Sequence, residues 1–228
     1  MTQVQEQTHE GVRKKRVLIV DDHPILRKGL SLLINQETDL MVGGEAEDAR
    51  RAIEQIDALK PDLVIVDISL PGIDGIELLR RIKQRYGELP TLVVSMHDES
   101  VFAERALRAG ARGYIMKQEA LENVLVAIRK VLGGEIFVSS RIATRMLEKL
   151  VDGHAARPAA SPIDLLSDRE LTVFRLIGQG FGTRQIAEKL HLSVKTVESY
   201  RSHLKDKLRL GTGTDLLKAA IEWVQSNS

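Results

Sequence analysis

The sequence predicts a doubly wound α/β domain followed by an all-α domain. Between residues 16 and 134, short apolar runs rich in β-branched residues alternate with segments of helical periodicity. This alternation is typical of βαβ units around a parallel sheet. After Gly134 the alternation ceases, and the remaining sequence shows helical patterns only. A chain of 228 residues is also long enough for two domains of ordinary size.

Five short apolar runs are the predicted strands. They are continuous rather than alternating, which indicates strands buried on both faces of the sheet. With right-handed crossovers, the simplest arrangement has strand order 2-1-3-4-5 and a switch point between the first and third strands. The second run is weaker than the others. The predicted strands are residues 17–20, 40–42, 63–66, 92–94 and 114–116.

Five helices are predicted to follow these strands. The first begins near Pro24, because proline has no backbone N–H group and the N–H groups at a helix start have no intrahelical partner anyway. This helix places Leu26, Leu30 and Leu33 on one stripe. The last covers residues 120–132, where apolar residues recur at i, i+3, i+4 and i+7. The other three are predicted at residues 48–59, 75–84 and 100–109.

The C-terminal third is predicted to contain a linker and a helix-turn-helix. Residues 139–151 could form one further helix, whereas residues 153–162, GHAARPAASP, are small, polar and interrupted by proline, as flexible linkers are. The S-x-x-E pattern at Ser167 predicts a capping box before the run 171–177. A turn at residues 191–193 then joins two segments at helix-turn-helix spacing. The remaining predicted helices are residues 183–190, 194–207 and 214–224.

Composition limits the class of protein. A sequence with 43% hydrophobic and 29% charged residues is typical of a globular protein. The absence of cysteine excludes a disulfide framework and thiolate metal sites, and the six histidines show no ligand-like spacing. No apolar stretch reaches the ~20 residues that a membrane span needs. We therefore expect a cytoplasmic protein with no membrane association and a disordered tail over residues 1–15.

Polar residues stand where four of the predicted strands end. Asp21 and Asp22 follow the first strand, Asp67 the third, Ser95 the fourth and Lys117 the fifth. The carboxyl ends of parallel strands meet at one edge of a sheet, so we expect these side chains to converge. Three neighbouring carboxylates must take up protons or hold a cation, and oxygen ligands favour Mg²⁺. The pattern predicts a phosphoryl group on a nucleophilic carboxylate, contacted by an ammonium and a hydroxyl group.

Residues 16–134 resemble the receiver domain of two-component response regulators. The motifs are DDHP at 21–24, VDISLPGIDG at 66–75, Ser95 at a strand end and GYIMK at 113–117. The resemblance implies a flavodoxin-like fold in which Asp67 accepts the phosphoryl group. It also implies that the Mg²⁺ ligands are Asp21, Asp22, Asp67 and the Ser69 backbone carbonyl. The residues of the implied switch are Ser95, Tyr114 and Lys117.

Phosphorylation is expected to change the switch physically. A dianionic phosphoryl group on Asp67 could draw in the Ser95 hydroxyl and leave room for Tyr114 to rotate inward. His23 is interpreted as a helix-start residue and not as a catalytic one.

The C-terminal region has the charge pattern of a nucleic-acid-binding helix. Residues 195–209 contain five Lys or Arg residues against two acidic ones, a net charge of +3 in a protein whose whole net charge is +1. Residues 164–228 resemble the LuxR-type DNA-binding domain, and together with the receiver the chain resembles the NarL/FixJ subfamily. The motifs are LSDRE at 166–170, GQG at 178–180, QIA at 185–187 and SVKTVESY at 193–200.

Two residues depart from the patterns of that resemblance. His191 occupies a turn position where helix-turn-helix proteins favour glycine, and Tyr200 stands where many relatives carry histidine. The terminal helix has Leu217, Ala220, Ile221 and Val224 on one side. Core packing is the simple interpretation of that side, and the resemblance suggests a dimer contact.

The predicted second helix of the motif supplies most of the DNA-binding candidates. Residues early in a recognition helix reach base edges, whereas flanking basic residues mostly hold phosphates. Glu198 could accept from a cytosine amino group or form an intrahelical pair with Arg201. The base-reading candidates are Glu198, Ser199 and Ser202. The backbone-holding candidates are Lys195, Thr196, Tyr200, Arg201 and Lys205, and Arg184 of the preceding helix is a further DNA-binding candidate.

The combined resemblance implies a DNA-binding response regulator and not an enzyme. Its implied partners are a sensor histidine kinase, double-stranded promoter DNA, a second copy of the chain after phosphorylation, and RNA polymerase. The expected domains are a receiver over 16–134, a partly helical linker over 135–163 and a DNA-binding domain over 164–228.

Two alternatives stay open at this stage. The receiver could be a phosphate-independent dimerisation platform, although such a platform could dispense with the acidic pair, Asp67 or Lys117, and all of them are present. A phosphohydrolase of the haloacid dehalogenase type would need an acidic residue where Ser69 stands.

Overall fold

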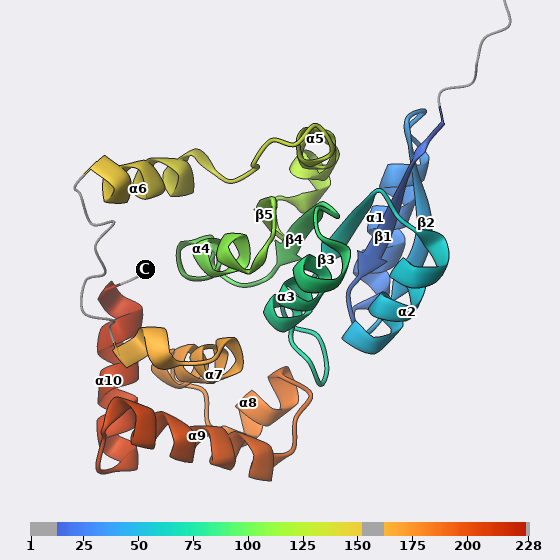
Figure 1. Cartoon of the computed structure of the whole chain (residues 1–228). Coiled ribbons are helices and arrows are strands. Elements are labelled where there is room, and N and C mark those ends of the chain that lie inside the picture. Colours follow the sequence, from blue (N-terminus) through green and yellow to red (C-terminus); the bar gives the residue numbers. More distant parts are fainter. Residues whose placement is uncertain (1–12, 152–161, 227–228) are drawn as a thin grey trace, which may run out of the picture.

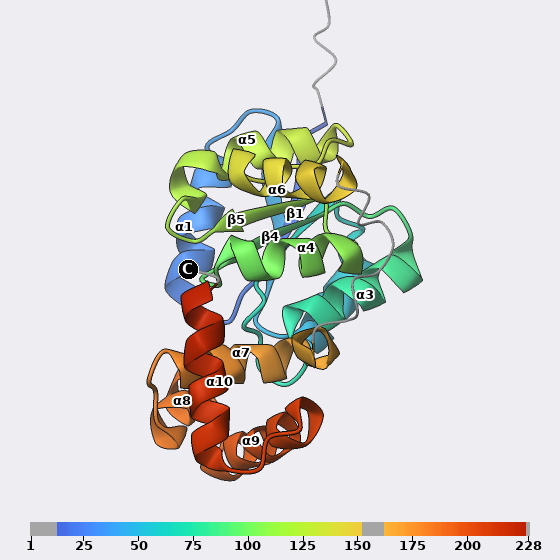
Figure 2. The same cartoon turned by 90° about the vertical axis from the view of Figure 1, so that its left-hand side faces the viewer.

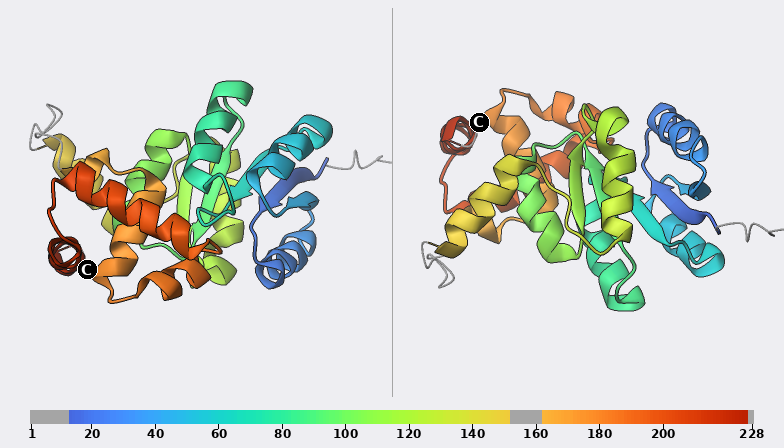
Figure 3. Two further views of the ribbon diagram at one scale, coloured as in Figure 1. Left: turned by 90° about the horizontal axis from the view of Figure 1, so that it is seen from below. Right: turned by 90° about the horizontal axis from the view of Figure 1, so that it is seen from above.

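The computed structural model describes residues 13–151 and 162–226. Its N-terminal part is a five-stranded parallel sheet of order β2-β1-β3-β4-β5, with helices on both faces (Figures 1 and 3). The C-terminal part is helical. The predicted fold class and strand order are therefore confirmed. The predicted flexible stretch at 153–162, except its last residue, and most of the predicted tail lie outside the described residues.

The strands match the predicted runs, and the second is the one that differs most. It extends four residues beyond the predicted end at residue 42 and includes Gly43 and Gly44, whose low strand propensity conceals it in the sequence. Its register with the first strand shifts between Val17 and Leu18. The bounds are β1 (Lys15–Val20), β2 (Leu40–Ala46), β3 (Leu63–Val66), β4 (Thr91–Ser95) and β5 (Gly113–Met116).

The first helix of the sheet domain begins at Pro24 as predicted, and the other four lie within two residues of their predicted bounds. Asp48, Asp74 and Asp98 each accept a hydrogen bond from the first turn of the helix that follows them, which satisfies an otherwise unpaired N–H group. The bounds are α1 (Pro24–Asn35), α2 (Ala49–Leu59), α3 (Gly75–Tyr86), α4 (Glu99–Ala109) and α5 (Ala120–Leu132).

The sheet separates two apolar layers. On one face, side chains such as Ile19 and Ile65 pack with those of α1 and α5. On the other, Leu18 and Val66 belong to a cluster of buried side chains that includes α2, α3 and α4 and continues into the C-terminal helices. The loops that follow β1, β3, β4 and β5 are thereby held together at the carboxyl edge of the sheet.

The C-terminal helices include the predicted helix-turn-helix. Ser167 and Glu170 form the predicted capping box, and the helix they cap begins at Asp168. His191 in the turn has φ 51, a left-handed conformation that explains why glycine is favoured there. The short η1 was not predicted. The bounds are α6 (Ser140–Val151), η1 (Pro162–Leu165), α7 (Asp168–Gly178), α8 (Thr183–Lys189), α9 (Val194–Leu208) and α10 (Gly213–Ser226). No helix within 13–151 or 162–226 has the length and apolar character that a bilayer span requires.

Gly75, the first residue of α3, packs against the backbone that carries Asp67. A Cβ atom on Gly75 would lie 2.0 Å from the Asp67 carbonyl oxygen and 2.8 Å from the Ile68 Cα, and neither backbone atom can rotate away. We expect Gly75→Ala to lower the free energy of unfolding by roughly 1–3 kcal/mol, the usual cost of overpacking. Urea denaturation monitored by circular dichroism measures this change.

Gly29→Ala is the matched control for that experiment. Gly29 lies inside α1, and nothing lies within 4 Å of a Cβ added there. Since alanine is the better helix former, we expect this variant to gain roughly 0.5–1 kcal/mol. Similar losses in both variants would contradict the close approach of α3 to the Asp67 backbone.

Candidate functional site

Lys117 and two aspartates form the centre of the predicted pocket. The Lys117 Nζ atom lies 2.7 Å from Asp67 Oδ2 and 2.7 Å from Asp21 Oδ2. All three side chains are at most 6% exposed. The Lys117 backbone N–H donates to the Ser95 carbonyl at 2.8 Å, which ties the end of β5 to the end of β4. The structure thus brings these loop residues together, as the sequence predicts.

The acidic side of the pocket has the ligands of a cation site. Asp21, Asp22, His23 and Asp67 each offer one ligand atom, and these atoms all lie within 4.8 Å of one another. Asp67 Oδ1 is buried and accepts no hydrogen bond among the described residues, and Asp22 Oδ1 is buried with only the His23 ring nitrogen near it. Buried carboxylate oxygens without partners are costly. A hard cation with oxygen ligands, such as Mg²⁺, would satisfy them, so the residues present fit that ion.

His23 and Ser69 border this group of carboxylates. The His23 Nδ1 atom lies 2.6 Å from Asp22 Oδ1 and 3.2 Å from Asp21 Oδ1, and its backbone N–H donates to Asp21 at 2.7 Å. His23 is also the residue before α1, the position that the sequence predicts for it. Ser69 lies two residues after Asp67 in the same loop, and its hydroxyl group contacts His97 instead.

The electrostatics of the pocket favour added positive charge. Burial raises the pKa of Asp21 above its ordinary value, and the neighbouring Asp67 raises it further, while Lys117 acts in the opposite direction. Burial alone would lower the pKa of Lys117, but Asp67 and Asp21 together raise it. The single Lys117 ammonium group therefore neutralises the charge of two carboxylates only in part.

We expect Asp21→Asn to stabilise the protein at neutral pH in the absence of divalent cations, by roughly 0.5–2 kcal/mol. Folding raises the pKa of Asp21 above its ordinary value of 3.8, so the folded state binds this proton more tightly than the unfolded state does. Ionised Asp21 therefore destabilises the fold above its folded pKa, and this cost disappears below the ordinary value.

Thermal unfolding of both proteins at a series of pH values measures this effect. The advantage of the variant should shrink as the pH falls through the acidic range. The control is Asp206→Asn, which removes an exposed carboxylate of α9 and should give no pH-dependent gain. An advantage of Asp21→Asn that is equal at about pH 7 and about pH 3 would show that desolvation of this carboxylate is not its cause.

Ser95 and Tyr114, the other two residues of the predicted switch beside Lys117, are buried next to the pocket. Ser95 is 0% exposed, and its hydroxyl oxygen accepts the backbone N–H of His97 at 3.2 Å. Tyr114 is 1% exposed, and its hydroxyl group donates to the His97 carbonyl at 2.8 Å. Burial raises the pKa of Tyr114, so its hydroxyl group stays protonated. In this structure the Tyr114 side chain already points inward, onto the loop that follows Ser95.

Two further residues contact the pocket and were not predicted. The His97 Nε2 atom lies 3.0 Å from Ser69 Oγ, and burial lowers the pKa of His97 to about 4. Its position two residues after Ser95 was the available signal. Arg27 of α1 donates to the Asp21 carbonyl and pairs with Glu45. In the sequence Arg27 resembles any charged residue on a helix surface.

The predicted DNA-binding residues lie together on α9, with Arg184 on α8. Val197 and Leu204 are fully buried and anchor α9 to its neighbours. The exposed candidates are Arg184, Lys195, Glu198, Ser199 and Ser202. The partly exposed candidates are Thr196, Tyr200, Arg201 and Lys205.

Local hydrogen bonds already occupy two of these side chains. The Thr196 hydroxyl lies 2.7 Å from that of Ser193, the N-cap residue, and the Ser199 hydroxyl donates to the Lys195 carbonyl at 3.1 Å. Within the described part of the chain, Glu198 and Arg201 form no ion pair. The arrangement therefore leaves the Glu198 carboxylate available to a ligand.

Two protein families match this chain. The response regulator receiver domain matches residues 17–129, and the luxR family of bacterial regulatory proteins matches residues 164–220. The oxygen regulatory protein NreC of Staphylococcus aureus is 35% identical over 210 residues, which cover 91% of this chain and 97% of NreC.

Solved structures give the same result. RcsB of Salmonella enterica serovar Typhimurium, bound to promoter rprA in the presence of the phosphomimetic BeF3-, is 30% identical with a TM-score of 0.57, covering 90% of this chain and 97% of that one. A LuxR-family two-component response regulator from Aurantimonas sp. SI85-9A1 is 38% identical with a TM-score of 0.56, covering 60% and 99%. Family membership removes the phosphohydrolase alternative. The chain belongs to the DNA-binding two-component response regulators of the LuxR/NarL type, which are transcription regulators and not enzymes.

Proposed function

We propose that a sensor histidine kinase phosphorylates Asp67, with Mg²⁺ bound, and that this modification switches dimerisation and promoter binding. The observation that carries the proposal is the contact between Asp67 and Lys117 at 2.7 Å inside a buried acidic pocket. The buried Oδ1 atom of Asp67, which accepts no hydrogen bond, supports a cation in the same pocket. Output from such a switch would be a change in transcription.

The pocket's residues can divide the chemistry among them. One carboxylate oxygen of Asp67 attacks phosphorus while the bond from phosphorus to the kinase histidine nitrogen breaks, which leaves an acyl phosphate on Asp67. Lys117 is placed to hold the oxygens of the transferred group. When bound, Mg²⁺ supplies charge neutralisation. The residues that would hold the ion are Asp21, Asp22 and Asp67, together with the Ser69 backbone carbonyl that the resemblance implies.

Ser95 links the proposed modification to the rest of the receiver. Its hydroxyl oxygen accepts the His97 N–H, and a hydroxyl group that accepts one hydrogen bond still has its own proton to donate, here to a phosphoryl oxygen. In the same loop, the His97 carbonyl accepts a hydrogen bond from the Tyr114 hydroxyl group. Movement at Ser95 would thus change the contacts of Tyr114 as well.

The C-terminal region would carry the output. In this proposal residues 16–134 receive the signal, 135–163 link the modules and 164–228 bind DNA in the cytoplasm, where RNA polymerase is also present. Base reading falls to Glu198, Ser199 and Ser202, and phosphate holding to Arg184, Lys195, Thr196, Tyr200, Arg201 and Lys205. On α10, Ala220 is buried, whereas Leu217 and Ile221 are 40% and 36% exposed. These two side chains are our candidates for contact with a second copy.

Selection of bound duplexes from a random DNA pool tests the proposal. The full chain would be used with and without acetyl phosphate and Mg²⁺, beside Asp67→Asn. We expect the phosphodonor to enrich a two-fold related sequence for the natural chain and to have no effect on the variant. If Asp67→Asn enriched that sequence equally well in all conditions, the receiver would be a phosphate-independent platform.

A further inference from the structure

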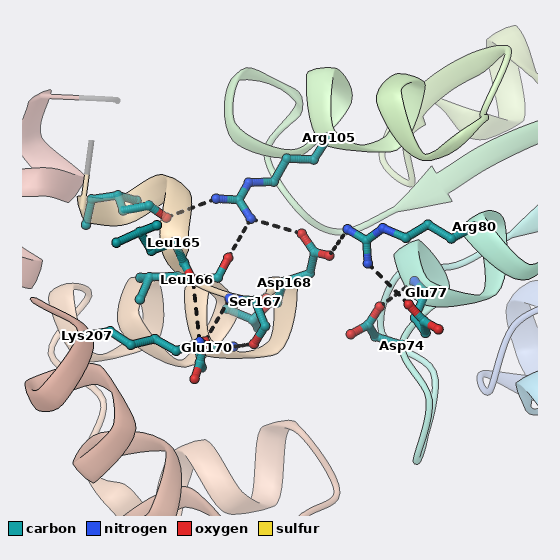
Figure 4. Close-up of polar contacts among 12 residues, drawn as sticks. Asp74, Glu77, Arg80, Arg105, Leu165, Leu166, Ser167, Asp168, Glu170 and Lys207 are labelled. Atoms are coloured by element: carbon teal, nitrogen blue, oxygen red, sulfur yellow. Dashed lines mark hydrogen bonds and ion pairs between the residues drawn. The ribbon is translucent and has the colours of Figure 1, made fainter. Parts of the chain in front are cut away.

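The first turn of α7 is clamped by two arginines of the receiver. Asp168 is 3% exposed. Its Oδ2 atom lies 3.1 Å from Arg80 of α3, and its Oδ1 atom lies 3.1 Å from Arg105 of α4. Figure 4 shows both guanidinium groups pointing at this one carboxylate. A buried carboxylate held by two cations from separate helices fixes the position of α7 relative to both.

Arg105 contributes more than this ion pair. It also donates to the carbonyls of Leu166 and Ile163, at 3.0 Å and 3.1 Å. Arg105 therefore binds both the turn before α7 and Asp168, the first residue of α7 (Figure 4). Its side chain is 22% exposed, less than half the 48% of Arg80. Arg105 is therefore the principal receiver contact of this surface.

Two other contacts reach the loops of the phospho-acceptor pocket. Arg169 is 7% exposed and donates to the Leu70 carbonyl at 2.6 Å. Leu70 lies in the loop after β3, three residues from Asp67. Arg175 lies 3.8 Å from Asp98, in the loop after β4 that begins at Ser95. The docked helix thus touches both loops that the proposed phosphorylation would affect.

The recognition helix is not part of this contact. Lys195, Glu198, Ser199 and Ser202 are exposed although both domains are present. In two perpendicular views α9 lies on the side of the helical domain away from the sheet, with α7 between them (Figures 1 and 2). Docking at α7 therefore leaves the α9 surface accessible to DNA.

We propose that the first turn of α7 is a docking element that fixes the position of the DNA-binding domain on the α3–α4 edge of the receiver without covering the recognition helix. The contact sets the separation and orientation of the domains, and hence which pairs of half-sites a dimer can reach. It does not decide whether α9 can touch DNA. The proposal uses only the interdomain contacts and stands whether or not Asp67 is the phospho-acceptor.

Arg105→Gln and Arg108→Gln are matched variants of α4. Both remove one positive charge, but Arg108 pairs with Glu104 of its own helix at 2.6 Å, is 79% exposed and forms no hydrogen bond or ion pair with the described C-terminal helices. In small-angle X-ray scattering of the unphosphorylated full chain, we expect Arg105→Gln to raise the radius of gyration from roughly 17 Å toward roughly 20 Å, as expected for a compact chain whose halves separate. Arg108→Gln should leave it unchanged. Asp168→Asn, which alters the other side of the contact, should match Arg105→Gln.

Binding to a non-specific duplex of mixed sequence, at one fixed salt concentration, supplies the second measurement. We expect Arg105→Gln and Arg108→Gln to bind within about twofold of each other, because α9 is open in both and their charge is equal. An unchanged radius of gyration in both Arg105→Gln and Asp168→Asn would refute the docking element. Binding that is about tenfold tighter for Arg105→Gln than for Arg108→Gln would show that docking covers the recognition helix, and would overturn the proposal.

Discussion

Asp67→Asn is expected to abolish acid-stable, base-labile phosphate incorporation from acetyl phosphate under conditions that label the natural chain fully. The amide of asparagine is not a nucleophile toward phosphorus, and no other carboxylate of the pocket stands in the same place. Asp21 also contacts Lys117, but it follows β1, whereas Asp67 follows β3. Phosphate-affinity gels measure the modified fraction. We expect a loss of at least about 10³-fold in rate, the scale on which removal of a nucleophile acts.

Asp57→Asn is the control for that experiment. Asp57 lies on α2, pairs with Arg85 and is 41% exposed, so it has the same chemistry outside the pocket. It should be labelled as fully as the natural chain. Persistent labelling of Asp67→Asn at the natural rate would remove Asp67 from the mechanism and leave the pocket without its proposed purpose.

Replacing Lys195 and Lys205 by alanine is expected to weaken DNA binding by roughly 100-fold, about tenfold for each charge-assisted phosphate contact. Both residues lie on α9. Binding releases about 0.9 counterion for each phosphate that is neutralised, so the variant releases fewer. The slope of log affinity against log salt concentration should therefore become shallower by about 1.8 for the loss of two contacts. Fluorescence anisotropy at several salt concentrations measures both quantities.

The matched double variant removes the same charge elsewhere. Lys28 of α1 is exposed, and Lys218 of α10 is 79% exposed and lies 4.0 Å from Glu222. Replacing these two by alanine should change the affinity by less than about twofold, the effect of distant screened charges. An unchanged salt slope in the α9 variant would mean that the basic face of α9 does not hold phosphates.

The strands and the pocket were predictable because their causes are local. Runs such as residues 63–66 are buried on both faces and therefore continuously apolar, and Asp67 follows that run directly. Parallel topology then brings strand ends together without further information. The second strand was predicted too short because Gly43 and Gly44 conceal its second half. The capping box at Ser167 was equally local and is present.

The interdomain contacts were not predictable from the sequence, for a physical reason. Arg80 and Arg105 have the appearance of ordinary charges on exposed helix faces, and Asp168 that of an acidic residue suited to the positive end of a helix. Their contact depends on how the two domains dock. The periodicity of apolar residues in a sequence predicts helices and strands but not how domains dock. His97 was missed similarly, since its partner Ser69 lies on another loop.

The most direct test of the account identifies the residue that carries the phosphate. Borohydride reduces an acyl phosphate of aspartate to homoserine, and peptide mass spectrometry locates that change in the chain. After incubation of the natural protein with acetyl phosphate and Mg²⁺, we expect homoserine at position 67 and at no other aspartate. Homoserine at position 21 or 22, or at none of the pocket aspartates, would contradict the account.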